Sequence, residues 1–147
     1  MLLDPIARPS VHARSFCALV MGAHVGIGDA ADDLIRDAQL VASELVTNAT
    51  NAGCTALSVD ISMRELLVRL AIFDNAAGLP EMAVPATLAE KGRGLMIVNA
   101  LAARWGVEAL PTGKVVWADF SLLPVVRRAS GEGDQGKDSR PTPRCQA

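Results

Sequence analysis

A long helical repeat of apolar residues occupies the second quarter of the chain. Intervals of three and four residues separate its members, as the buried stripe of an amphipathic helix requires. Asp29 is a suitable N-cap and Gly53 a suitable stop, so the pattern predicts a helix over residues 29–52. Such a helix must bury its stripe against a second layer. The members of the repeat are Leu34, Ala38, Val41, Leu45, Ala49 and Ala52.

Shorter patterns predict the other elements. Two runs on each side of the third helix alternate apolar and polar residues, as half-buried strands do. The predicted elements, in chain order, are helices over 13–21 and 29–52, strands over 57–62 and 68–72, a helix over 94–104, and strands over 105–110 and 115–122. Helices and strand pairs follow one another in blocks without βαβ alternation, so we expect an α+β two-layer sandwich.

The same patterns divide the chain into three parts. Residues 1–12 carry two prolines and are expected to form an extended lead-in, and residues 13–124 form one domain. From residue 127 onward there is no Ile, Leu, Val, Phe or Trp. A segment of this composition cannot bury enough surface to order itself, so residues 125–147 are predicted to be a disordered tail.

Composition excludes several classes of function. Lys and Arg total 14 against 16 Asp and Glu, for a net charge of -2, and no basic block suggests direct nucleic-acid binding. The longest apolar run, residues 95–103, is too short to span a membrane. Cys17, Cys54 and Cys145 are odd in number and widely spaced, which favours neither a disulfide framework nor a metal site. We therefore expect a cytoplasmic protein.

Three polar residues share one border of the apolar stripe on the long helix. At 100° per residue, Glu44, Asn48 and Asn51 fall together beside the buried face. A solvated helix flank has the same pattern, so these residues gain meaning only from the rest of the chain.

Two further features supply that context. Asp74 ends a predicted buried strand, and such a carboxylate can be a turn residue or can accept a hydrogen bond from an exocyclic amine such as that of adenine. Gly92 and Gly94 flank Arg93 ahead of the third helix. Their small size lets the first backbone N–H groups of that helix approach a phosphate.

Five segments together resemble a known family. They are Glu44–Ala49 (ELVTNA), Asp74–Pro80 (DNAAGLP), Gly92–Val98 (GRGLMIV), Arg104–Val107 (RWGV) and Gly113–Ala118 (GKVVWA). These segments are similar to the sequence boxes of the GHKL ATPase and kinase superfamily, and most of all to those of bacterial anti-sigma-factor serine kinases. The resemblance covers about residues 10–122.

The resemblance implies a Bergerat fold, with helices on one face of a mixed, mainly antiparallel sheet. It also implies ATP and Mg²⁺ as cofactors. Asn48 would ligate Mg²⁺, Glu44 would be the general base toward a protein hydroxyl, and Asp74 would bind adenine. The candidate cofactor-binding residues are Asn48, Asn51, Asp74, Gly78, Gly92, Arg93, Gly94 and Leu95.

The leading functional hypothesis is an ATP-dependent serine/threonine protein kinase of the anti-sigma-factor type. It would phosphorylate a small antagonist protein, bind a sigma factor and form a homodimer through residues 10–21, with no direct contact to nucleic acid or membrane.

Two alternatives remain open. One is a degenerate, non-catalytic GHKL binding module, favoured by Ala76 where relatives carry a glycine and by Val115 where they carry a threonine near the adenine. The other is a detached catalytic domain of a two-component histidine kinase, although no dimerisation helix with an acceptor histidine precedes the domain.

Overall fold

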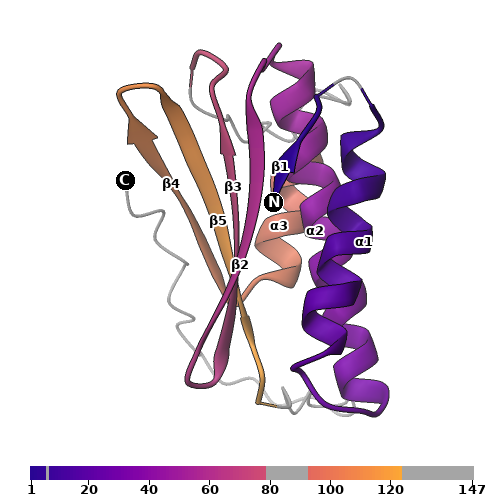
Figure 1. Cartoon of the computed structure of the whole chain (residues 1–147). Helices are drawn as coiled ribbons and strands as arrows, with labels where there is room; N and C mark the ends of the chain where they lie inside the picture. Colours follow the sequence, from indigo (N-terminus) through magenta and orange to yellow (C-terminus); the bar gives the residue numbers. More distant parts are fainter. Residues whose placement is uncertain (6, 79–92, 124–147) are drawn as a thin grey trace, which may run out of the picture.

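The computed structural model describes residues 1–5, 7–78 and 93–123, which form three helices packed on one face of a sheet (Figure 1). This arrangement confirms the predicted α+β two-layer sandwich. The elements are β1 (Leu2–Leu3), α1 (Pro9–Gly22), α2 (Asp29–Asn51), β2 (Leu57–Arg64), β3 (Leu67–Asp74), α3 (Arg93–Leu101), β4 (Arg104–Leu110) and β5 (Gly113–Ser121). Residue 6, residues 79–92 and residues 124–147, which include the predicted tail over 125–147, lie outside the described residues.

The sheet has the strand order β1-β2-β3-β5-β4, and each of these pairings is antiparallel. The expectation of a mixed sheet is therefore wrong for the described part of the chain. The reason lies in how the last hairpin adds to the sheet. After α3 the chain enters β4 at the edge and then turns back, so that β5 rather than β4 lies beside β3.

Successive side chains of a strand point to opposite faces of the sheet, so each strand contributes every second residue to the face under the helices. One face of β3 and β5 packs under the helices. Its residues are Val68, Leu70, Ile72 and Asp74 on β3, and Lys114, Val116, Ala118 and Phe120 on β5, all of them buried. The core is thus continuous along these two strands and ends, at one end, in two charged residues.

The long helix α2 follows its predicted stripe, and Ala38, Val41, Leu45 and Ala49 are buried against the sheet or α1. It begins at Asp29, with Gly28 as the N-cap, one residue from the expected position. No helix within the described ranges is long and apolar enough to span a bilayer.

The N-terminal region differs from the extended lead-in expected over residues 1–12. Helix α1 begins at Pro9, because proline presets φ for the first helical position and loses no hydrogen bond there. Leu2 and Leu3 pair with β2 as an edge strand, and two residues are too few to show an alternating pattern. At the other predicted boundary, α3 ends at Leu101, so that Arg104 already belongs to β4.

Candidate functional site

The first half of the candidate site lies where α2 meets the start of α3. Glu44 and Asn48 are half-buried and stand one helical turn apart on α2. A Cβ atom added to Gly94 would lie 2.9 Å from Asn48 Nδ2 and 3.1 Å from Glu44 Oε2. The absence of a side chain at Gly94 therefore allows α3 to approach both polar groups. The fold thus brings Gly94 beside two residues that lie 50 and 46 positions earlier in the sequence.

The structure does not bring the other candidate residues of α2 and α3 into this group. Leu95 is buried in the core, so its side chain packs the domain and only its backbone could face a ligand. Arg93 is the first residue of α3, and Gly92 lies outside the described residues. Asn51 is the exposed last residue of α2, and within the described residues it makes no hydrogen bond or ion pair with the other candidates. Glu44, Asn48 and Gly94 are thus the predicted residues that meet here.

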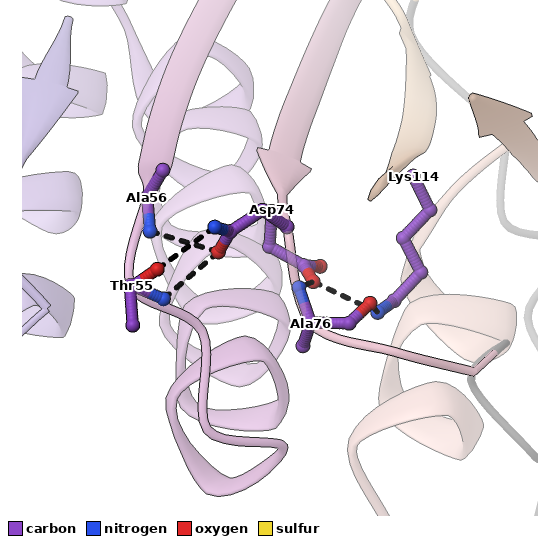
Figure 2. Close-up of polar contacts among 6 residues, drawn as sticks. Thr55, Ala56, Asp74, Ala76 and Lys114 are labelled. Atoms are coloured by element: carbon purple, nitrogen blue, oxygen red, sulfur yellow. Dashed lines mark hydrogen bonds and ion pairs between the residues drawn. The ribbon is translucent and has the colours of Figure 1, made fainter. Parts of the chain in front are cut away.

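The second half of the site is a buried ion pair at the end of β3 (Figure 2). Asp74 is 2% exposed and Lys114 is 5% exposed, and the two are cross-strand partners of β3 and β5. Lys114 Nζ donates to Asp74 Oδ1 at 2.8 Å and to the carbonyl oxygen of Ala76 at 3.1 Å. The backbone N–H of Ala76 donates to the same Oδ1 at 2.9 Å. A closed ring of hydrogen bonds therefore joins the carboxylate, the ammonium and the following turn.

The backbone around this pair is anchored on both sides. Asn75 Oδ1 accepts hydrogen bonds from the backbone N–H groups of Thr55 and Ala56, both at 2.8 Å (Figure 2). On the other side, Gly113 has φ 152°, and a Cβ there would lie 2.2 Å from the carbonyl oxygen of Asp74. Only glycine allows this approach, so Gly113 brings Lys114 into register with Asp74.

Ala76 and Val115 are the two departures from the family pattern, and neither distorts the backbone around Asp74. Ala76 is not among the described residues with positive φ, so it holds its turn without the backbone strain that alanine would suffer there. Val115 pairs with Phe73, between the buried positions Lys114 and Val116. It therefore faces the open side of the sheet, opposite to the face that carries Asp74. The strand residue beside Asp74 is Lys114.

A depression of about 470 Å³ opens beside the ion pair. It lies between the segment that follows β3 and the β4–β5 turn. Of the ion pair only Lys114 lines it, and Asp74, Glu44 and Asn48 do not. Gly78, with φ 83°, contributes one wall, and Lys114 is its charged lining residue. The lining residues are Asn75, Ala76, Ala77, Gly78, Ala109, Leu110, Pro111, Thr112, Gly113 and Lys114.

The charge of Asp74 acts on a neighbouring thiol. Burial, followed by the negative charge of Asp74, raises the pKa of Cys54, and the positive charge of Lys114 partly offsets this. Cys54 is therefore held as the neutral thiol at neutral pH. Within the described segments no three His, Cys, Asp or Glu residues are grouped as a metal site would require.

Lys114 was not among the residues predicted for the site, although it lies in the segment Gly113–Ala118. A signal for it exists in the strand alternation. Val116, Ala118 and Phe120 predict the buried face of β5, and the same parity places Lys114 on that face. A lysine at a position with buried parity requires an anionic partner, which here is Asp74.

Comparison with known proteins adds one finding to this geometry. A family model described as the histidine kinase-like ATPase domain matches residues 7–120. A search of curated proteins gave no match. The matched range spans every element from α1 to β5 and so includes both halves of the site.

Proposed function

The chain belongs to the histidine kinase-like ATPase domain family, and on this basis we propose that it is an ATP-dependent serine/threonine protein kinase of the anti-sigma-factor type. The observation that carries the proposal is the meeting of Glu44, Asn48 and Gly94. A carboxylate, a carboxamide and the start of a helix are the groups needed to hold and transfer a phosphoryl group.

Asn48 is the residue that would hold Mg²⁺. Its side-chain oxygen is a hard donor, and Gly94 leaves open the space beside it that a Cβ would fill. Mg²⁺ accepts few protein ligands when phosphate oxygens and water complete its coordination, so one Asn is a chemically adequate set. When bound, the ion would neutralise phosphate charge. The N–H groups at the start of α3 would support the same charge.

Glu44 would act as the general base. No hydrogen bond or ion pair to another described residue occupies its carboxylate, which is half-buried one turn from Asn48. In the proposed reaction a serine or threonine oxygen of the acceptor protein attacks the γ-phosphorus. The bond from that phosphorus to the β–γ bridging oxygen breaks, ADP leaves, and the hydroxyl proton passes to Glu44.

Asp74 would bind the adenine, and its environment supports that role. It is buried at the end of β3, its charge is compensated by Lys114, and it lies at the head of a turn held on both sides. A carboxylate held in this way can accept a hydrogen bond from the exocyclic amine of the base.

For partners, we propose a small serine-bearing antagonist as phosphate acceptor, a sigma factor as the regulated protein, and a homodimer through α1. The support for the homodimer is apolar surface on that helix. Leu19 is 74% exposed and Val11 is also exposed, eight residues earlier on the same side of the helix. Phe16 packs partly against the core and supplies less of this surface than its size suggests.

The non-catalytic binding module remains the second candidate, although its support has weakened. It rested on Ala76 and Val115, and neither residue perturbs the geometry around Asp74. The two candidates differ in one property, which is phosphoryl transfer.

The deciding experiment measures Mg-ATP binding by thermal shift and phosphoryl transfer from labelled ATP. A ligand bound only by the folded state raises the melting temperature. We expect Asn48→Ala to abolish the shift, and Glu44→Gln to retain it while lowering transfer by about 10²-fold or more. Arg36→Gln, an exposed change on the same helix, is the matched control. If the wild type gives no shift with millimolar Mg-ATP, the ATP-dependent kinase is excluded.

A further inference from the structure

The two oxygens of the Asp74 carboxylate are used unequally. Oδ1 accepts two hydrogen bonds, from Lys114 Nζ and from the N–H of Ala76. Oδ2 accepts none from the described residues. It nevertheless keeps some contact with solvent, because no fully buried side-chain oxygen in the described part of the chain lacks a partner. One oxygen is thus saturated, and the other is free for a donor from outside the protein.

Lys114 creates this inequality. Its ammonium group bonds both the carboxylate and the carbonyl oxygen of Ala76, so it fixes the rotamer of Asp74 and the shape of the turn together. It also supplies the countercharge of a carboxylate that is only 2% exposed. Without Lys114, Oδ1 would lose the charged donor that orients the carboxylate.

We propose that Lys114 is a positioning residue that determines which base the site accepts. By occupying Oδ1 and compensating its charge, Lys114 leaves Oδ2 as one oriented acceptor, which matches a 6-amino group and rejects a 6-oxo group. The proposal rests on the proposed ATP site and adds to it the residue that sets the base preference. Lys114 acts through Asp74 and needs no contact with the base.

The test compares two nucleotides that differ only in the group at position 6 of the base. ITP has the triphosphate and ribose of ATP but carries an oxo group in place of the 6-amino group. Dissociation constants of both are measured by calorimetry, with Mg²⁺, for the intact wild-type chain. We expect ATP to bind about 10- to 100-fold more tightly than ITP, the effect of a hydrogen bond to a charged acceptor.

The informative variant is Lys114→Met, in which this preference should fall below about threefold, because the Asp74 carboxylate loses the donor that fixes its rotamer and Oδ2 is no longer one oriented acceptor. Partial unfolding does not obscure the result. Both nucleotides bind the same folded fraction, so it cancels in the ratio. If the variant is too unstable, trimethylamine oxide favours its folded state. Lys114→Arg, which keeps the charge, should restore a preference for ATP. Arg36→Gln, which removes a positive charge from an exposed position on α2, should leave the wild-type ratio unchanged.

The outcomes separate this inference from the proposed function. A wild type that binds neither nucleotide refutes the ATP site itself. A wild type that prefers ATP, together with a Lys114→Met variant that keeps the whole preference, refutes only the role of Lys114. A wild type that binds ATP and ITP equally refutes base selection by Asp74 and leaves phosphate binding at Asn48 in place.

Discussion

Two buried carboxylates on this sheet, Asp74 and Asp119, are paired with cations across the same two strands, on opposite faces. Asp119 accepts hydrogen bonds from Arg69 at both oxygens, at 2.6 and 2.9 Å, and a third from Arg104 at 2.8 Å. Asp74 uses only Oδ1. Asp119 therefore has no free oxygen, whereas Asp74 keeps one.

Their cations differ as well. Lys114 is buried with Asp74, but Arg69 and Arg104 are half-exposed, and Arg69 stacks over the ring of Trp117, 4.1 Å from its centroid. Burial opposes ionisation of Asp119, yet its hydrogen bonds and the charges of the two arginines outweigh that effect and hold its pKa below the ordinary value. A saturated pair of this kind stabilises the sheet. An unsaturated pair at the end of the core is suited to binding a ligand.

The largest expected difference is in nucleotide binding. Asp74→Asn removes the charged acceptor and should weaken Mg-ATP binding by about 10- to 100-fold. Asp119→Asn should change it by less than about twofold, since Asp119 lies on the opposite face of the sheet from Asp74. Titration calorimetry on both variants measures this contrast. Comparable losses in the two would show that the carboxylates are not functionally distinct.

A second pair of variants, at Gly94 and Gly106, contrasts the candidate site with the open face of the sheet. A Cβ at Gly94 would meet the movable side chains of Asn48 and Glu44, whereas a Cβ at Gly106 would lie 2.6 Å from the ring of Trp117. We expect Gly94→Ala to weaken Mg-ATP binding by about tenfold with little change in stability, since alanine favours the helix. Gly106→Ala should lower the free energy of unfolding by about 1–3 kcal/mol and leave binding unchanged.

Urea unfolding and nucleotide titration of both glycine variants test this crossed pattern. A Gly106→Ala protein with wild-type stability would mean that the Trp117 ring moves without cost. A Gly94→Ala protein with wild-type affinity would show that the open space at Gly94 is not needed for phosphate binding.

The smallest expected effect concerns acid stability. The folded-state pKa of Asp119 is lowered, so its contribution to stability is present above the unfolded-state value near pH 4 and is lost as pH falls through the folded-state pKa. Asp119→Asn should cost about 1–2 kcal/mol at neutral pH, a modest amount because Arg69 and Arg104 can hydrate. Calorimetric melting temperatures of wild type and variant should converge below about pH 4. A constant gap down to about pH 3 would contradict the assignment of this ion pair.

Much of the fold follows from local sequence. The stripe from Leu34 to Ala52 predicts α2 because helical periodicity involves neighbours within one element. Likewise, alternation predicts β2, β3, β4 and β5. Glu44, Asn48, Asp74 and Gly94 could be named as candidates because the segments that carry them resemble those of the GHKL superfamily. The sequence by itself therefore determined the elements other than β1, and most of the polar residues of the candidate site.

Only the tertiary structure decided how those residues meet. Asp74 and Lys114 are 40 positions apart, and their pairing depends on the register between β3 and β5. A shift of one residue would exchange Lys114 for Val115 on the buried face. Register between distant strands is set by the packing of the whole core and by close approaches such as that of Gly113 to Asp74, which no local period contains. The same physical reason hides the edge strand β1, since its two residues acquire structure only by pairing with β2.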